Sequence, residues 1–177
     1  MIKKPGPYII AVTGAESTGK SILTQQLAKH FNAPFYSEFA REYISGLNRQ
    51  YNISDVEFIA KKQIEQYNEA INSNHKLIFF DTWLLITKVW FEVVFSKAPD
   101  WIESNIKNSK ISGFILNDID IPWEPDPVRE NGGENRIILH NKYLKNLEKS
   151  NFNFYLNSGF NSKRINNAIK FVTSIII

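Results

Sequence analysis

The segment from Gly14 to Ser21 reads Gly-Ala-Glu-Ser-Thr-Gly-Lys-Ser and matches the pattern G-x-x-x-x-G-K-S. An apolar run at 8–12 precedes it, and a helical pattern of apolar residues at 22–28 follows it. This order of strand, loop and helix separates a functional phosphate-binding loop (P-loop) from a chance match. Glycines let successive backbone N–H groups turn toward phosphate oxygens, and the N-terminus of the following helix adds partial positive charge. The segment therefore predicts a nucleoside triphosphate site.

Two side chains of the P-loop have specific tasks in such a site. Lys20 reaches the outer phosphates, and the Ser21 hydroxyl is suited to ligate Mg²⁺. The alternative is a strand-to-helix turn that binds nothing, but all four fixed positions of the pattern are filled here. We expect ATP as the phosphoryl donor, Mg²⁺ as the metal, and nucleotide contacts from these residues: Gly14, Glu16, Ser17, Thr18, Gly19, Lys20, Ser21 and Ile22.

The composition limits the class of protein. A chain of 177 residues with 43% hydrophobic and 22% charged residues is most simply one globular domain. The absence of cysteine excludes disulfides, thiolate zinc sites and cysteine nucleophiles, and agrees with a cytoplasmic location. We find no signal peptide or membrane span, and the formal charge of +3 comes from scattered lysines rather than a basic run. We expect a cytoplasmic protein whose partner is a small molecule rather than a membrane or a nucleic acid; the oligomeric state stays open.

Apolar runs alternate with helical patterns along the chain, which favours an α/β fold built from repeated β-α units. The segment 54–57 predicts a capping box for one helix, and Asn161 predicts the cap of the last helix. Strands alternating with helices of this length predict a parallel five-stranded sheet flanked by helices, the three-layer fold of P-loop NTPases. The strands are expected at 8–13, 35–37, 77–81, 113–117 and 152–156.

Charged residues gather directly after the second expected strand, in the segment 36–42. Ligands of parallel sheets bind at the carboxyl ends of the strands, so an acceptor molecule facing the triphosphate would lie here. Glu38 would orient an attacking hydroxyl or accept its proton, and Arg41 would bind an anion or hold that carboxylate in place. The alternative is a solvated first helical turn, with Glu38 at the positive end of the helix dipole. We expect acceptor contacts from Tyr36, Glu38 and Arg41.

The third expected strand ends in Asp81 after four apolar residues, 77–80. This arrangement is Walker-B-like: the carboxylate approaches Mg²⁺ directly or through water. The alternative is a helix cap formed by Asp81 and Thr82, but the P-loop upstream favours the metal role. Trp83 either stacks on a flat aromatic substrate or is an ordinary core or surface tryptophan.

Residues 119–137 are rich in Pro, Gly and Asn and predict a long irregular loop. Ordered loops of this length are usually functional lids. Arg129 and Arg136 lie within it, and phosphoryl transfer uses such arginines to stabilise charge on the transferred group while water is excluded. The alternative is exposed ion pairs of these arginines with Glu130 and Glu134, which contribute little.

The turn at 157–161, after the fifth expected strand, leads into the last helix, which carries Arg164. In a P-loop kinase architecture this turn passes near the adenine of the nucleotide. Arg164 either stacks on that adenine or lies on the helix surface.

Taken together, these residues resemble the ribosylnicotinamide kinase domain of the NadR type, a branch of the P-loop nucleoside and nucleotide kinases. Order and spacing agree over essentially the whole chain, which we interpret as a single kinase domain, 1–177, with a lid at about 119–137. The Glu-Ser pair of the P-loop and the pattern Pro-Trp-x-x-Asp-x-x-Arg are more specific than a bare P-loop. The matching segments are 14–21, Glu38-Phe39-Ala40-Arg41-Glu42-Tyr43, Phe80-Asp81-Thr82, Pro122-Trp123, Pro125-Asp126, Arg129 and Arg136.

The resemblance implies transfer of the ATP γ-phosphate to the ribose 5′-hydroxyl of nicotinamide riboside, which gives nicotinamide mononucleotide for NAD biosynthesis. It implies Ser21 and Asp81 at the metal, and either Glu38 or Asp81 as the base. The implied site consists of catalytic Lys20, Glu38, Asp81, Arg129 and Arg136, nucleotide-binding residues of the P-loop with Arg164, and acceptor-binding Tyr36, Glu38, Arg41, Trp83 and Trp123.

The chain departs from the family pattern at Pro127, where relatives usually have a glycine, and we expect this proline to stiffen the lid. Bifunctional relatives carry an adenylyltransferase domain upstream, and we expect neither that activity nor transcriptional repression here.

Two other functions stay open. A deoxynucleoside or thymidylate-type kinase would share the layout, although such kinases more often have Glu-Pro after the second strand and Asp-Arg or Glu-Arg after the third. A regulatory P-loop ATPase switch would bind ATP to control a partner and would phosphorylate no small molecule.

Overall fold

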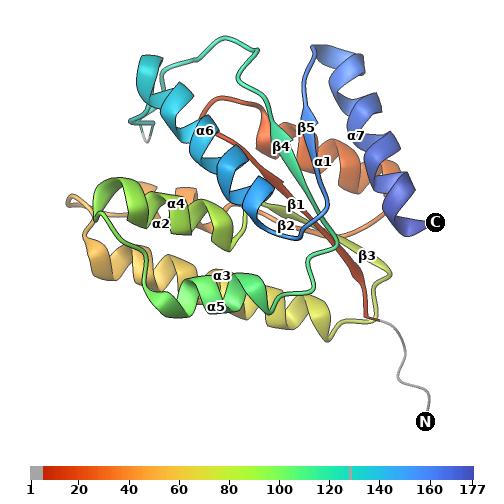
Figure 1. The fold of residues 1–177 in the computed structure, drawn as a ribbon, viewed down its shortest axis with the longest axis horizontal. Coiled ribbons are helices and arrows are strands. Elements are labelled where there is room, and N and C mark those ends of the chain that lie inside the picture. The colour runs from red at the N-terminus through yellow and green to blue at the C-terminus, as the bar shows by residue number, and fades with distance from the viewer. Residues whose placement is uncertain (1–5, 128) are drawn as a thin grey trace.

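The computed structural model describes residues 6–127 and 129–177. A parallel sheet runs through the middle of the molecule, and helices connect its strands (Figure 1). In chain order the elements are β1 Tyr8–Thr13, α1 Lys20–Phe31, β2 Phe35–Tyr36, α2 Phe39–Ser45, α3 Ile53–Ile71, β3 Leu77–Asp81, α4 Leu84–Val94, α5 Asp100–Lys107, β4 Gly113–Asn117, α6 Gly133–Lys149, β5 Phe154–Asn157 and α7 Asn161–Ile176.

The five strands lie in the order β2-β3-β1-β4-β5, and every neighbouring pair is parallel. The strand order changes direction at β1, which lies between β3 and β4. Ligands of such sheets bind beyond the carboxyl ends of the strands at this point. The register pairs Val12 with Asp81 and Thr13 with Leu116, so the carboxyl ends of β1, β3 and β4 meet at one edge.

Helices cover both faces of the sheet and form two separate apolar clusters. Ile10 and Val12 of β1 pack with α1 and α7 on one face. Ile9 and Ala11 pack on the other face, in a cluster that includes residues of α3, α4, α5 and α6. Because β1 is buried on both faces, its sequence is a continuous apolar run rather than an alternating one.

The predicted α/β class and the five strands agree with this structure. β1, β3 and β4 have the predicted bounds, whereas β2 ends one residue early and β5 lies at 154–157 rather than 152–156. In the part of the chain that the structure describes, no helix combines the length and the apolar character that crossing a bilayer requires.

Two predicted helix caps are wrong. The capping box of α3 is formed by Asn52 and Asp55 rather than by 54–57: the Asn52 side chain accepts from the Asp55 N–H at 3.4 Å, and the Asp55 carboxylate accepts from the Asn52 N–H at 2.8 Å. Asparagine caps helices as well as serine does, so the helix begins earlier than the Ser-led pattern indicates. Asn161 does not cap α7, because it is the first helical residue and Phe160 is the N-cap.

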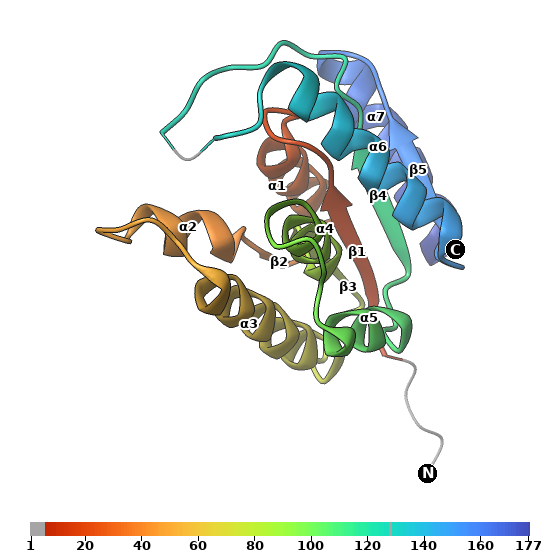
Figure 2. The same ribbon diagram turned by 60° about the vertical axis from the view of Figure 1, so that its left-hand side comes forward.

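The irregular segment before α6 is shorter than predicted. It covers 118–132, which we call the lid segment; Val128 lies outside the described residues. It projects beyond the carboxyl end of the sheet, toward the side on which α2 lies (Figure 2). Arg136 is therefore not part of a loop, since it lies in the first turns of α6.

Candidate functional site

The P-loop joins the end of β1 to the start of α1, as the sequence predicts. Its backbone needs positive φ at Gly14 (140°) and Gly19 (73°). A Cβ atom at Gly14 would lie 2.8 Å from the Asn117 carbonyl oxygen, so only glycine fits there. The Thr18 hydroxyl donates to the Ala15 carbonyl at 2.8 Å across the loop. These contacts hold the loop in a defined shape.

Lys20 and Ser21 begin α1 and lie at the mouth of the P-loop. The Lys20 Nζ donates to the Ala15 carbonyl at 3.0 Å, which keeps the ammonium group over the loop. Ile22, the next residue, is 65% exposed. The three positions are thus accessible to a ligand that approaches the N-terminus of α1.

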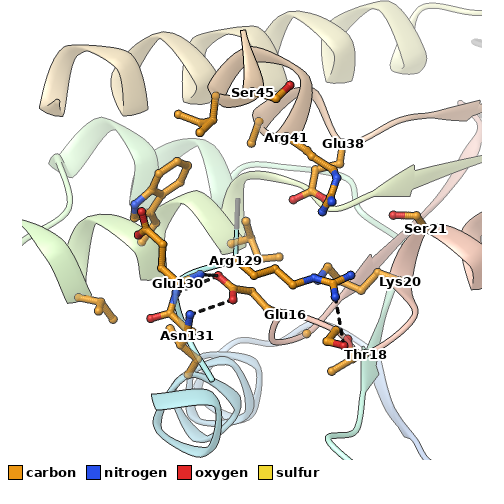
Figure 3. A pocket seen from close by; sticks show the side chains of 18 of the residues that line it. Glu16, Thr18, Lys20, Ser21, Glu38, Arg41, Ser45, Arg129, Glu130 and Asn131 are labelled. Atoms are coloured by element: carbon orange, nitrogen blue, oxygen red, sulfur yellow. Dashed lines mark hydrogen bonds between the residues drawn. The ribbon is translucent and has the colours of Figure 1, made fainter. Parts of the chain in front are cut away.

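A cavity of 570 Å³ opens beside the P-loop (Figure 3). Its walls come from the P-loop, α2, α4, the lid segment and α6. This volume is typical of small-molecule sites. The predicted site residues that line it are Gly14, Glu16, Ser17, Thr18, Gly19, Lys20, Ser21, Ile22, Glu38, Arg41 and Arg129.

Asp81 ends β3 at the same edge of the sheet and is 4% exposed. Burial raises the pKa of its carboxyl to about 6, and the negative charge of Glu38 adds to the rise. A hydrogen bond from the Ser21 hydroxyl and the positive charge of Lys20 oppose the rise. Among the described residues, the Asp81 Oδ1 has no hydrogen-bond partner. This buried oxygen is suited to hold a proton or a cation.

Two charged residues enter the cavity from α2. Glu38 is the N-cap residue of this helix, but its side chain makes no capping hydrogen bond and instead faces the cavity (Figure 3). Arg41 forms an ion pair with Asp126 of the lid segment.

Burial, together with the negative charges of Glu38 and Glu16, raises the pKa of Tyr143 well above its usual value. The Tyr143 phenol on the α6 side of the cavity therefore stays neutral.

Arg129 enters the cavity from the lid segment, as predicted. Its Nη1 atom donates to the Glu124 carbonyl at 2.5 Å and lies 3.5 Å from the Ser17 hydroxyl oxygen. Pro127, which we expected to stiffen the lid, lines the same cavity. The lid segment is thus held against the P-loop in this structure.

Arg136 does not line the cavity, although it was predicted to clamp the transferred phosphoryl group. It is 7% exposed and donates to the carbonyl oxygens of Glu16 at 3.1 Å, Ser17 at 2.9 Å and Ile121 at 2.8 Å. Its donors are satisfied by the backbone because α6 begins earlier than expected and carries the side chain behind the P-loop. Arg136 thus supports the loop from outside the cavity, and its role as a phosphate clamp stays a prediction.

Arg164 likewise has a supporting position rather than a place against an adenine. It is 8% exposed and forms an ion pair with Asp120 at 2.8 Å. It also donates to the carbonyl oxygens of Asp118 at 2.8 Å and Thr18 at 3.3 Å. Arg164 therefore ties α7 to the P-loop and to the segment that follows β4.

Neither tryptophan predicted to stack on a substrate lines the cavity. Trp83 is 1% exposed and lies in the core, with its ring 5.4 Å from that of Tyr67 and 6.5 Å from that of Phe114. Trp123 packs inside the lid segment, where a Cβ atom at Gly132 would lie 3.3 Å from its ring. Of the two interpretations of Trp83, the structure supports the core tryptophan.

Tyr36 also lies away from the cavity. Its ring stacks on Phe80 at 4.8 Å, and its hydroxyl lies 3.4 Å from Glu69 of α3. β2 ends at this residue and its side chain turns toward α3, so the acceptor contact of Tyr36 stays a prediction.

Three aromatic residues that line the cavity were missed by the sequence analysis: Tyr143, Tyr51 and Trp90. Trp90 of α4 donates from its indole nitrogen to the Tyr51 hydroxyl at 3.3 Å, and the two rings meet edge-to-face at 5.0 Å. The Tyr51 hydroxyl lies 3.1 Å from the Glu130 carboxylate of the lid segment. Trp90 lies about two helical turns after Trp83 on an apolar helix, and this pattern equally indicates a core residue. No motif surrounds Tyr51. The sequence therefore gives neither residue a signal of a binding role.

Comparison with known families agrees with this geometry. The model of a family described as an AAA domain matches residues 9–161. The chain belongs to this AAA-domain family. The matched range begins in β1 and ends at the start of α7, so it includes the P-loop, Asp81 and the lid segment.

Curated relatives point to the NadR type. The chain is 27% identical over 150 residues to the trifunctional NAD biosynthesis/regulator protein NadR of Escherichia coli (strain K12), and the alignment covers 82% of this chain and 37% of that protein. The identity to NadR of Salmonella typhimurium (strain LT2) is 26% over the same length and with the same coverage. The resemblance to the NadR type is thus confirmed, while the chain spans little more than a third of the length of these relatives.

Solved structures confirm the fold. A NadR protein in complex with NR has a TM-score of 0.80 and 23% identity, covering 96% of this chain and 50% of that chain. A NadR protein in complex with NAD and AMP-PNP has a TM-score of 0.74 and 23% identity, covering 96% of this chain and 49% of that one. Thymidylate kinase from Ehrlichia chaffeensis has a TM-score of 0.69 and 12% identity, covering 98% of this chain and 100% of that chain. The α/β P-loop fold with a parallel five-stranded sheet is therefore confirmed.

Proposed function

We propose that this protein is an ATP- and Mg²⁺-dependent kinase that phosphorylates the 5′-hydroxyl of nicotinamide riboside and forms nicotinamide mononucleotide for NAD biosynthesis. The observation that carries the proposal is a single cavity lined by the P-loop on one side and by Glu38, Arg41, Tyr51 and Trp90 on the other. One shared cavity lets a nucleoside hydroxyl approach the terminal phosphate directly, which is the main requirement of phosphoryl transfer. The NadR structures in complex with NR and with AMP-PNP support nicotinamide riboside as the acceptor and ATP as the donor in this proposal.

Lys20 and Arg129 are the cations that stabilise the transferred phosphoryl group in this proposal. Both line the cavity, and both donate to backbone carbonyls in loops, Lys20 to Ala15 and Arg129 to Glu124. A phosphate oxygen is a stronger acceptor than a carbonyl, so both side chains can exchange one partner for the other. Charge on the equatorial oxygens in the transition state would then be neutralised from two sides.

Ser21 and Asp81 are the residues that would hold Mg²⁺. The Asp81 Oδ1 is buried without a partner among the described residues, and the Ser21 hydroxyl bonds to the same carboxyl group. No group of three or more His, Cys, Asp or Glu side chains in the described part of the chain forms a metal cage. The Asp81 carboxylate and the Ser21 hydroxyl suit Mg²⁺, which is usually bound by one or two carboxylates together with substrate phosphates. Bound Mg²⁺ would neutralise charge on the phosphates.

Glu38 is the residue that we assign to the acceptor hydroxyl. It lines the cavity without a capping hydrogen bond, whereas Asp81 is buried beside Ser21. A carboxylate in this position orients the attacking oxygen and accepts its proton. In this proposal Glu38 is the base and Asp81 is left to the metal.

The aromatic side of the cavity is suited to a flat, positively charged base. Trp90 and Tyr51 offer ring faces or edges, and the Glu130 carboxylate lies against the Tyr51 hydroxyl. A pyridinium ring is attracted both to aromatic faces and to a nearby negative charge.

We further propose that the chain forms one kinase domain, since its own helices cover both faces of its sheet. We also propose that it works in the cytoplasm and uses ATP.

The experiment is Mg²⁺-dependent ADP release from ATP with nicotinamide riboside, thymidine, deoxyadenosine or no acceptor. We expect strong stimulation by nicotinamide riboside alone. Stimulation by a deoxynucleoside instead would move the protein to the thymidylate-type alternative. Stimulation by none of them, with ATP still bound, would favour the ATPase switch.

Lys20→Ala and Lys29→Ala form a matched pair for this assay. Both lysines lie on α1, but Lys29 is exposed in its last turn, away from the cavity. We expect the Lys20 variant to lose at least a hundredfold in rate and the Lys29 variant to keep the wild-type rate.

A further inference from the structure

We propose that Glu16 is a positioning residue that fastens the lid segment to the P-loop and thereby keeps water out of the phosphoryl-transfer site; the proposal rests on the proposed kinase function. Glu16 occupies a variable position of the P-loop pattern, where phosphate binding sets no requirement on the side chain. Its carboxylate is turned toward the lid segment (Figure 3). The backbone N–H and the side-chain amide of Asn131 each donate to it at 2.9 Å, and the Glu130 N–H donates at 3.3 Å.

These three donors lie just before α6, a helix of 17 residues that begins at Gly133. The N-cap residue Gly132 has no side chain that caps the helix. A carboxylate near a helix N-terminus gains from the helix dipole, and its bonds to N–H groups are stronger than those between neutral groups. Glu16 thus brings a carboxylate from the P-loop to the start of α6, in addition to that of Glu134 in the first turn of the helix.

The neighbouring residue, Ser17, contacts the N-terminal half of the lid segment. The Ser17 hydroxyl accepts from the Glu124 N–H at 3.0 Å, and the Arg136 guanidinium binds the carbonyl oxygens of both Glu16 and Ser17. Two adjacent P-loop residues therefore contact both halves of the lid segment. A change in the P-loop on nucleotide binding would be transmitted directly to the lid.

The lid segment also contacts the acceptor side of the cavity. Asp126 pairs with Arg41 of α2, and Glu130 lies against Tyr51. The lid segment thus bridges the donor and acceptor halves, with Glu16 as its charged attachment on the donor side. If this attachment fails, water can compete with the nucleoside: a water oxygen bonds to the γ-phosphorus, the bond to the ADP oxygen breaks, and ADP and phosphate are formed without a nucleotide product.

The test compares Glu16→Gln with Glu134→Gln in the full chain. Glutamine keeps the size of the side chain but brings an amide N–H₂ toward groups that themselves donate, so at least one bond to the lid segment is lost. Glu134 is an exposed carboxylate in the first turn of α6 and lies away from the cavity, so it controls for charge at the same helix end.

Hydrogen exchange without nucleotide or acceptor measures the attachment itself. We expect the amides of residues 130 and 131 to exchange about tenfold faster in Glu16→Gln than in the wild type, and at the wild-type rate in Glu134→Gln. Asn131→Ala, which removes one donor from the lid side, should give a smaller increase. Unchanged exchange in Glu16→Gln, or an equal increase in Glu134→Gln, overturns the proposal.

The ratio of ADP formed to nucleotide product measures the catalytic consequence. We expect this ratio to be near one in the wild type and to rise several-fold in Glu16→Gln, with kcat for transfer reduced and the KM for ATP within about threefold. A purely structural role would lower both products together, so an unchanged ratio overturns the proposal. If the wild type does not phosphorylate nicotinamide riboside, the proposed function fails, whereas the exchange measurement still decides whether Glu16 fastens the lid segment.

Discussion

Burial of the Asp81 carboxyl couples the chemistry of the site to the stability of the protein. Its pKa rises from an ordinary value of 3.8 to about 6, chiefly through desolvation. A raised pKa in the folded state means that ionisation opposes folding. The penalty is absent below about pH 4, grows through the interval up to about pH 6, and is complete above it. The metal-free protein therefore carries a cost at neutral pH that a cation at Asp81 would relieve.

Asp81→Asn should stabilise the metal-free protein while abolishing activity. A pKa raised from 3.8 to about 6 corresponds to about 3 kcal/mol, an upper bound on the gain in the free energy of unfolding at pH 7. The kinase rate should fall at least a hundredfold, because the metal loses its carboxylate. Urea unfolding with a chelator at pH 4, 5, 6 and 7 checks the first part. Wild-type and variant curves that run parallel across this range would show that Asp81 is not the group responsible.

Trp90 and Tyr51 are the residues that we expect to read the base of the acceptor. Stacking of a base on an aromatic side chain contributes about 1–3 kcal/mol. Trp90→Leu should therefore raise the KM for the nucleoside about tenfold or more and leave the KM for ATP within about twofold. Trp101→Leu is the matched control, because Trp101 lies on α5 and does not line the cavity. An equal rise in both KM values for Trp90→Leu would count against an acceptor role.

At the level of helices and loops, local sequence patterns predict the strands and motifs of the site correctly but misplace the starts of some helices. The β-strands next to the site follow from apolar runs that end in polar residues, and Asp81 and the P-loop follow from their motifs. The wrong cap of α3 has a local cause, since Asn52 and Ser54 are both suited to the capping position. The position of Arg136 also depends on where a helix begins: once α6 begins at Gly133, this side chain points behind the P-loop.

Asn52→Ala should destabilise the protein by about 1 kcal/mol, because α3 loses a side-chain acceptor at its N-terminus. Ser54→Ala, at the position that the sequence pattern favours, should cost less than about half of that. Thermal or urea unfolding of the two variants distinguishes the two capping boxes. A larger loss for Ser54→Ala would contradict the Asn52–Asp55 box.

Arg136→Met should weaken ATP binding although Arg136 lies outside the cavity. The change leaves three carbonyl oxygens without their donor, two of them in the P-loop, and an unsatisfied buried polar group costs about 1–3 kcal/mol. We expect the Kd for ATP to rise about tenfold and the midpoint of thermal unfolding to fall. Lys145→Met, an exposed change on the same helix, is the control. Loss of kcat with an unchanged Kd would instead support direct contact with the phosphoryl group.

For the molecule as a whole, the sequence predicts the architecture and the donor half of the site better than the acceptor half. The P-loop and Asp81 are local motifs, so their place follows from a few neighbouring residues. The acceptor half is assembled from Tyr51, Trp90 and Glu130, which come from a loop, a helix and the lid segment. Only the packing of α4 against the rest of the molecule brings them together, and that packing also buries Trp83. Long-range assembly of this kind leaves no signature in a single sequence.

The most direct measurement is the mass of the product formed from ATP and nicotinamide riboside by the purified protein with Mg²⁺. We predict nicotinamide mononucleotide, with the phosphoryl group on the ribose 5′-oxygen and one ADP for each product molecule. Lys20→Ala should form none, and Lys29→Ala should form as much as the wild type. Release of ADP and inorganic phosphate with no phosphorylated nucleoside would contradict the account.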